Sequence, residues 1–299
     1  MSKMKVIRIN HANDDLAVVN SARCSFDKVK TRIGSDDVRL IKYLAEHGHF
    51  TPFSHVRFGA LTNLTAFSQL EEMLEFMGDP TKSASMKLQK RNRGWYIEHS
   101  LYGWATNDIP INNYDNIITA IVEKCPYSIL SLLSDEKLKR IQGVEPDRLI
   151  KTTDKTVLIE APLFVLRQLM KSTIGCTYNE VSRRYVDFKP TFYTIDQFKA
   201  RPDKSMKQGA GDFLSLDKQE HYKKLQEKSM EFCATIYEDF LIDVAPEESR
   251  AFLSQNMMSK VWLTASEEAF DRILGLRKGK TAQTQIRELM DLFEKALKE

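Results

Sequence analysis

The run TYNEVSRRY, residues 177–185, places a carboxylate, a hydroxyl and a guanidinium at alternate positions. In an extended backbone successive side chains point to opposite faces, so Glu180, Ser182 and Arg184 would share one face. A carboxylate accepts hydrogen bonds from sugar hydroxyls, and a guanidinium and a hydroxyl donate to phosphate oxygens. The pattern is thus suited to a phosphorylated sugar, although a solvated edge strand with a charged face has the same spacing.

Further donors precede this run. A helix is predicted between Pro162 and Gly175. Arg167 and Lys171 are four residues apart, so they would share one face of that helix, with Gln168 beside them. The end of the helix would deliver these donors towards the face described above.

Two more arginines occur in short motifs further along the chain. Arg250 lies in PEESRAFL and Arg277 in LRKGKTAQTQI. If these side chains converge with those above, the pocket has several donors and few acceptors, as a site for a mononucleotide or a phosphorylated cofactor has. Taken singly, each arginine is more often part of a surface salt bridge.

The elements that would position these residues are read from periodicity and turn residues. A strand is predicted at 4–10, a helix at 36–47, and a strand from Thr156 that breaks at Pro162 into the helix above. Further helices are predicted at 218–244, 246–253, 266–276 and 282–297. The chain is therefore predicted to be α+β, with a central, mainly antiparallel sheet flanked by helices and a long helical C-terminal half.

The segment 61–155 is predicted to be an ordered insertion. The aromatic residues between Trp95 and Trp104 are poor candidates for a disordered linker. They could cover a ring-shaped ligand as a lid, or pack in a core. The basic and aromatic stretch QKRNRGWYIEH leaves nucleic-acid binding as an alternative, which would show a steep salt dependence.

Composition and charge argue against several classes of partner. The 299 residues are 42% hydrophobic and 28% charged, which is ordinary for a globular protein. The 44 basic and 41 acidic residues give a formal charge of +3, too little for a global field that would hold nucleic acid or an anionic membrane. Because the sequence has no apolar run of signal-peptide or membrane-spanning length, we expect a soluble, cytoplasmic protein, in the host cytoplasm if it is viral.

Cysteine and histidine chemistry is weighed separately. The cysteines are widely separated and expected to be reduced: Cys24, Cys125, Cys176 and Cys233. Cys176, close to the cations above, could be a nucleophile of low pKa, although a small buried residue is the simpler interpretation. His49 and His55 lack a third ligand at a plausible spacing, so no metal site is expected.

Short pieces of the sequence occur in an order typical of one family. They are SARCSF at 21–26, HGHFTPFSH at 47–55, APLFVLRQ at 161–168, NEVSRRY at 179–185, PEESRAFL at 246–253 and LRKGKTAQTQI at 276–286. The chain resembles the flavin-dependent thymidylate synthases. The resemblance covers most of residues 4–60 and 156–297, so we expect a single domain, 1–299, interrupted by an insertion at about 61–155.

This resemblance implies a reaction and a set of site residues. The reaction is the reductive methylation of dUMP to dTMP, in which 5,10-methylenetetrahydrofolate supplies the carbon, FAD passes a hydride and NADPH reduces the flavin. The residues implied to bind dUMP are Gln168, Lys171, Glu180, Ser182, Arg184, Arg250 and Arg277. Arg277 is also implied to be catalytic, because a fixed guanidinium favours ionisation at N3 of the uracil. The residues implied to lie at FAD are Ser25, His55, Arg57, Lys171, Ser172, Thr173, Ser266 and Arg272. The family also implies a homotetramer with sites formed between subunits.

The chain departs from the family pattern near the flavin. Family members usually carry Arg-His-Arg where this chain has Lys171, Ser172 and Thr173, and asparagines where it has Ser266 and Arg272. Two alternatives follow: a folate-dependent dUMP or dCMP hydroxymethylase of the same fold, or a non-catalytic dUMP-binding homologue. Product formation without NADPH consumption would indicate the first alternative, and a colourless protein that binds dUMP would indicate the second.

Overall fold

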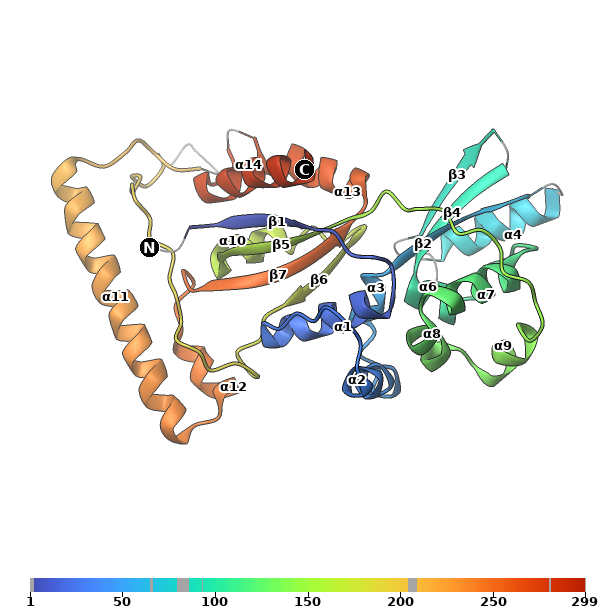
Figure 1. Ribbon diagram of the computed structural model, residues 1–299. Helices are drawn as coiled ribbons and strands as arrows, with labels where there is room; N and C mark the ends of the chain where they lie inside the picture. Colours follow the sequence, from blue (N-terminus) through green and yellow to red (C-terminus); the bar gives the residue numbers. More distant parts are fainter. Residues whose placement is uncertain are drawn as a thin grey trace.

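Within the described residues, the fold comprises a lobe on a four-stranded sheet, a lobe on a three-stranded sheet, and a long helix that stands beside them (Figure 1). The computed structural model describes residues 3–64, 67–79, 86–92, 94–203, 209–279 and 281–298. In these residues no helix is long and apolar enough to cross a membrane.

The four-stranded sheet is antiparallel throughout. Its strands lie in the order β1 (Lys5–Ile9), β5 (Lys155–Pro162), β7 (Met258–Ala265) and β6 (Cys176–Glu180). Nearly every residue of β7 is buried, because this strand has a neighbour on each side and a packed layer on each face. The predicted α+β class, with an antiparallel sheet flanked by helices, is confirmed.

Helices from the second half of the chain cover one face of this sheet (Figure 1). They are α10 (Leu163–Leu169), α13 (Glu267–Arg277) and α14 (Thr284–Lys298). The buried positions of α14 recur at helical spacing, so they form one apolar stripe: Ile286, Leu289, Met290, Phe293 and Ala296. This stripe packs with the inward side chains of β5 and β7. The predicted break at Pro162 is confirmed, since Pro162 ends β5 and directly precedes α10.

The N-terminal helices lie towards the other face of the sheet. They are α1 (Asp15–Arg23), η1 (Cys24–Phe26), α2 (Ser35–Glu46) and α3 (Thr51–Ser54). The side chain of Asp14 caps α1, because it accepts a hydrogen bond from the Ala17 N–H at 3.0 Å. Cys24 of η1 packs against Trp262 of β7, which joins this layer to the sheet.

The second lobe contains most of the segment predicted to be an insertion. Its sheet has the order β2 (Arg57–Thr62), β4 (Gly94–Ser100) and β3 (Lys87–Arg91). Its helices are α4 (Phe67–Gly78), α6 (Leu101–Thr106), α7 (Tyr114–Lys124), α8 (Pro126–Leu132) and α9 (Asp135–Arg140). Tyr96 and Trp104 are fully buried in its core. The core-packing interpretation of the aromatic cluster is therefore correct for these two residues.

A long helix, α11 (Leu216–Asp243), stands away from both lobes in Figure 1. It leads into α12 (Pro246–Ser249) and η2 (Arg250–Phe252). All of α11 is described, and Tyr237 is its one buried residue. Tyr222, Leu225 and Phe232 are exposed and lie along one side of the helix because they are three and seven residues apart. The helix thus presents an apolar strip to its surroundings.

The predicted extended run 177–185 is wrong in its second half. β6 ends at Glu180, and the Tyr185 N–H donates to the Ser182 carbonyl at 2.9 Å in a turn. The reason is tertiary: the Ser182 N–H donates to the carbonyl of Ser25 at 3.0 Å, which takes the backbone out of the β6–β7 ladder. Glu180, Ser182 and Arg184 therefore do not alternate along one strand.

The predicted helical pairing of Arg167 with Lys171 is also wrong. α10 ends at Leu169, and Lys171 lies in the loop between α10 and β6. The hydroxyl of Tyr178 donates to the Ser172 carbonyl at 2.9 Å. This contact from β6 holds the chain in a loop where the helix was expected to continue.

Candidate functional site

A cavity of about 930 Å³ opens between the N-terminal helices and β6. We call it the large cavity. Residues 178–180 of β6 form one wall, and α1, η1 and α2 form the other. Its cationic lining residues are Arg23, Lys28 and Arg39. The rings of Phe26 and Tyr185 also line it and are stacked, with their centroids 4.8 Å apart. The volume suits a nucleotide-sized ligand.

Glu180 is the carboxylate at the end of β6, on the wall of the large cavity. The Ser259 hydroxyl donates to Glu180 Oε1 at 2.8 Å. Burial raises the pKa of Glu180, and the Ser259 hydrogen bond and the charges of Arg167 and Arg250 oppose that rise. The carboxyl group is thus fixed in position beside two cations, where it can accept hydrogen bonds from a ligand hydroxyl.

Ser182 and Arg184 occupy the turn after β6. The Arg184 N–H donates to Ser182 Oγ at 3.3 Å. Arg184 Nε donates to Glu247 Oε2 at 3.0 Å, and both side chains are about half exposed. Arg250 Nε donates to the Glu247 carbonyl at 3.2 Å, so it lies beside the same residue. Since exposed ion pairs contribute little stability, Arg184 can leave Glu247 for a ligand phosphate at low cost.

Ser25 joins the two predicted sets of site residues. Its hydroxyl donates to the carbonyl of Glu180 at 3.2 Å, and its own carbonyl accepts from the Ser182 N–H. Ser25 also lines the large cavity. The structure therefore brings a residue predicted at FAD together with two predicted at dUMP.

Gln168 and Arg277 form a separate group. Arg277 Nη2 donates to the Gln168 carbonyl at 2.9 Å, and Gln168 Nε2 donates to the side chain of Gln283. Neither Gln168 nor Arg277 is among the described residues that line the large cavity. Within one subunit they belong to the junction of α10, α13 and α14.

The residues that replace the family's Arg-His-Arg lie in the loop before β6. Lys171 and Thr173 are exposed, whereas Ser172 is buried. Ser266 caps α13, since its Oγ accepts from the Ala269 N–H at 3.2 Å. Arg272 donates to the carbonyl of Ile174 in the same loop. These residues form a second group, next to the N-terminal end of β6.

Cys176 begins β6 close to this group. Burial raises the pKa of its thiol, although the hydroxyl of Tyr178 and the charge of Arg272 oppose the rise. The raised pKa disfavours the thiolate that a nucleophile requires. The structure favours the interpretation of Cys176 as a packing residue.

His55 and Arg57 line another cavity, of about 280 Å³, where the two lobes meet. We call it the small cavity. Arg57 Nε lies 2.6 Å from Asp154 Oδ2. Burial raises the pKa of Asp154 to about 7, even though Arg57 opposes the rise. His55 is buried, and its Nδ1 lies 2.7 Å from Thr264 Oγ1.

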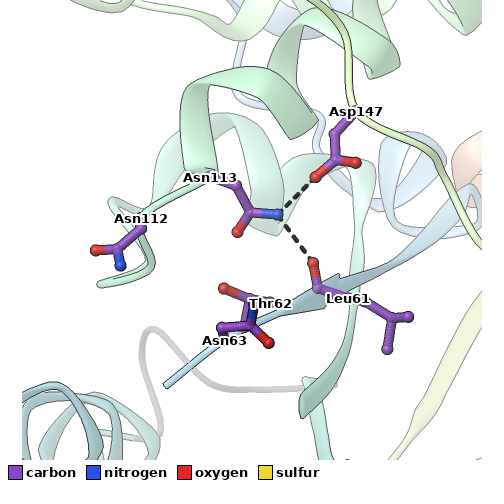
Figure 2. A pocket seen from close by; sticks show the side chains of 6 residues that line it. All are labelled: Leu61, Thr62, Asn63, Asn112, Asn113 and Asp147. Atoms are coloured by element: carbon purple, nitrogen blue, oxygen red, sulfur yellow. Dashed lines mark hydrogen bonds between the residues drawn. The ribbon is translucent and has the colours of Figure 1, made fainter. Parts of the chain in front are cut away.

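A further cavity, of about 340 Å³, lies inside the second lobe (Figure 2). Its lining residues are Leu61, Thr62, Asn63, Asn112, Asn113 and Asp147. Asn113 Nδ2 donates to the Leu61 carbonyl at 2.9 Å and to Asp147 Oδ2 at 2.6 Å. Because its lining has a carboxylate and no cationic residue among those described, this cavity is unsuited to a phosphorylated ligand.

The site includes residues that the sequence analysis did not single out. Ser259 orients Glu180 from β7, and no local signal marks it because the two residues are paired only by the sheet. Asn179 lies within NEVSRRY, and it donates to the Ser21 carbonyl at 2.8 Å from the wall of the large cavity. Asp154 was hidden in the segment taken for an insertion. Among the described residues no group of three or more His, Cys, Asp or Glu could hold a metal ion.

Comparison with known proteins decides the family. Residues 128–299, more than half of the chain, match the family described as "Thymidylate synthase complementing protein". The chain belongs to this family. The predicted resemblance is therefore confirmed at the level of the thymidylate synthase complementing proteins. Because the match begins within 61–155, it does not define the limits of the predicted insertion.

Similar proteins carry one name. A flavin-dependent thymidylate synthase from Aquifex aeolicus is 27% identical over 317 aligned residues, which cover 98% of this chain and 96% of that protein. The flavin-dependent thymidylate synthase of Streptomyces coelicolor is 30% identical over 41% of this chain and 50% of that protein. A solved structure, the UMP/dUMP methylase PolB from Streptomyces cacaoi bound with 5-Br UMP, has a TM-score of 0.48 at 18% identity, over 99% of this chain and 89% of that one. At family level, the chain is thus a methyltransferase of the thymidylate synthase type with a flavin cofactor.

Proposed function

We propose that this protein catalyses the reductive methylation of dUMP to dTMP, with 5,10-methylenetetrahydrofolate and NADPH as co-substrates. A bound FAD would supply the hydride chemistry. The single observation that carries the proposal is the setting of Glu180, a carboxylate fixed by Ser259 on the wall of the large cavity and flanked by Arg167 and Arg250. An acceptor for a ribose hydroxyl beside cations for a phosphate is what a mononucleotide needs.

The described residues fit a flavin nucleotide as well. The large cavity has cations that can meet a pyrophosphate and the stacked rings of Phe26 and Tyr185, against which a planar ring system can pack. Ser25 lines this cavity, and its hydroxyl could hold the group. His55 and Arg57 line the small cavity instead, and Arg277 lines neither.

We propose that a second and further copies of the chain complete the site, as a homotetramer. The support is that the implied flavin residues fall into separate groups within one subunit, and that α11 exposes Tyr222, Leu225 and Phe232. A surface strip of this kind is typical of a subunit interface. The side chains that one subunit keeps apart would then converge from different copies.

The test is turnover by the purified protein with FAD, NADPH, dUMP and 5,10-methylenetetrahydrofolate under anaerobic conditions. We expect a flavin absorption band that bleaches on NADPH addition, and dTMP as the product in mass spectrometry. The Glu180→Gln variant should bind dUMP more weakly, because a neutral amide is a poorer acceptor and one of its groups only donates. Glu160→Gln on β5, which changes a carboxylate paired with Lys5, is the matched control and should bind dUMP normally. Unchanged dUMP binding by Glu180→Gln would refute the site.

Lys171, Ser172 and Thr173 are the observation that keeps a second candidate open. Two cations and an imidazole have been replaced by one cation and two hydroxyls, which could change whether hydride or water reaches the transferred carbon. A hydroxymethylated dUMP or dCMP formed without NADPH consumption would favour the hydroxymethylase. Binding of dUMP without flavin or product would favour the non-catalytic homologue.

A further inference from the structure

Four side chains form a continuous chain of hydrogen bonds beside the small cavity. His11 Nε2 lies 3.0 Å from Thr156 Oγ1, which lies 2.7 Å from Thr264 Oγ1, and Thr264 Oγ1 lies 2.7 Å from His55 Nδ1. Thr156 and Thr264 face each other in the β5–β7 ladder, so the register of the sheet sets the central link. The chain therefore joins two imidazoles through two hydroxyl groups.

The chain has one buried end and one that is more open. Thr156 and Thr264 are each 4% exposed and His55 is 1% exposed, whereas His11 is half-buried and lines the small cavity. The rings of His11 and His55 both lie 6.4 Å from the ring of Trp262, one parallel to it and one edge-on. Trp262 thus holds both imidazoles in place.

The carbonyl of Ala12 sets the direction of the hydrogen bonds. A carbonyl oxygen only accepts, so His11 Nδ1, 3.0 Å from that oxygen, must carry a proton. When His11 is neutral, its Nε2 accepts from Thr156, Thr156 accepts from Thr264, and Thr264 accepts from the Nδ1–H of His55. His55 is then left with an unprotonated Nε2.

That Nε2 atom is buried and has no hydrogen-bond partner of normal geometry in the described part of the chain. Asn179 is the polar side chain beside His55, and it lines the large cavity. Since Asn179 Nδ2 donates to the Ser21 carbonyl, its oxygen is the group left to face a donor. A proton on His55 Nε2 would therefore have an acceptor available at the wall of the large cavity.

We propose that His11, Thr156, Thr264 and His55 form a proton path between the large and small cavities, in which the protonation of His11 sets the tautomer of His55. A proton that binds His55 Nε2 releases the Nδ1 proton to Thr264. Thr264 passes its own proton to Thr156, and Thr156 passes its proton to His11 Nε2. His55 ends neutral with its proton on Nε2, His11 ends as the imidazolium, and both hydroxyls have turned round.

The electrostatics suit a path that passes protons on without storing them at its buried end. Burial lowers the pKa of His55 to about 3, and His11 adds to this effect, so the double protonation of His55 is disfavoured. Burial also lowers the pKa of His11, while its hydrogen bond to Ala12 and the charge of Asp14 oppose the change and Arg8 reinforces it. The other charged groups at the small cavity are Arg57, Lys151 and Asp154.

The path itself does not depend on the proposed function, whereas its use in turnover does. If dUMP and flavin bind in the large cavity, a reaction there that releases or takes up a proton gains an exit through His11. His11, Thr156 and Thr264 are then positioning residues that act through His55.

The test is magic-angle-spinning NMR of the ligand-free protein with only its histidines labelled with ¹⁵N. Protonated and unprotonated ring nitrogens of imidazole have well-separated ¹⁵N shifts, so the tautomer of His55 is read directly. We expect His55 to carry its proton on Nδ1 at high pH and to exchange it for Nε2 as His11 titrates, within about pH 5 to 8. A wild-type His55 that keeps one tautomer throughout would overturn the proposal.

Variants separate a proton path from a merely structural contact. Thr264→Val keeps the side-chain shape and removes the hydroxyl, so the His55 signals should stop responding to pH, whereas Thr264→Ser should restore the response. Thr156→Val gives the same test at a second position, and His11→Phe keeps a ring on Trp262 without a titrating nitrogen. A normal His55 response in either valine variant would refute the path. Calorimetric dUMP affinity, measured on the same samples, tests the proposed function independently.

Discussion

Glu180 and Arg184 lie three and seven residues after Thr177, yet the structure gives them different surroundings. Glu180 is held by Ser259 at the end of β6, and Arg184 forms a half-exposed ion pair with Glu247. The first is fixed before a ligand arrives, while the second can reorient. A site of this kind would orient the sugar through Glu180 and capture the phosphate through Arg184.

Arg184→Ala is expected to weaken dUMP binding by about 1.5 to 3 kcal/mol, or about 10- to 150-fold in Kd, because a charge-assisted hydrogen bond is lost. Isothermal titration calorimetry would measure it. Lys189→Ala is the matched control, since Lys189 also forms an exposed ion pair, 3.3 Å from Glu238. Equal affinities of the wild type and Arg184→Ala would remove Arg184 from the site.

Asp154 gives a prediction for the pH dependence of stability. Burial raises its pKa to about 7 from the usual 3.8, so the folded protein retains a proton that the unfolded chain releases. This group's contribution to stability is present below about pH 4 and is lost as the pH rises to about 7, with a slope of at most about 1.4 kcal/mol per pH unit. Asp154→Asn removes the titrating group. Its stability relative to wild type, from urea unfolding, should therefore increase between pH 4 and pH 7, and a constant difference would contradict the assignment.

At the scale of elements, α14 is the principal cover of the four-stranded sheet on the face that carries α10 and α13. Phe293 is fully buried in its stripe, with its ring centroid 6.0 Å from that of Phe270. Because the Ser172 loop and the cap of α13 are supported by this layer, its packing also positions the loop that replaces the family's Arg-His-Arg.

Phe293→Ala should lower the free energy of unfolding by about 3 to 5 kcal/mol, since it removes apolar contacts and leaves a cavity. Urea unfolding at one fixed protein concentration would measure the loss, because subunit association changes apparent stability. Leu276→Ala on α13 is the control: Leu276 is 64% exposed, and a change within about 0.5 kcal/mol is expected. A similar small effect for both variants would show that α14 contributes little to the fold.

At the scale of the whole molecule, α11 and the two lobes lie side by side in Figure 1, with the small cavity between the lobes. We propose that the chain acts as a single domain in which 61–155 is an insertion, because β2 and β4 pair across that segment while Asp154 returns to Arg57. The lobe so formed supplies one wall of the small cavity.

Phe232→Glu on α11 is expected to shift the protein from tetramer towards smaller species, because a buried charge in an apolar interface is costly. Light scattering coupled to size-exclusion chromatography would report the mass, and circular dichroism would confirm folding. Leu74→Glu on α4 is the control, because Leu74 is 59% exposed and lies in the other lobe. If Phe232→Glu leaves the mass unchanged, α11 is not the interface.

The sequence by itself determined the elements that carry their own local signal. Pro162 marked the change from strand to helix because its ring fits a helix start, and the stripe Ile286 to Ala296 marked α14 because its spacing is helical. The order of the short motifs indicated the family. These features depend on neighbours within a few residues, so they can be read from the chain alone.

Only the tertiary structure decided which residues meet. β7 was not predicted, since a central strand buried on both faces lacks the alternation of an edge strand. The pairing of β6 with β7 placed Ser259 beside Glu180, and the contact of Ser182 with Ser25 ended β6 early. The link from Thr156 to Thr264 likewise exists only through the register of β5 and β7. Each of these contacts joins residues far apart in the chain, and sheet register, which brings them together, is set by the packing of the whole core.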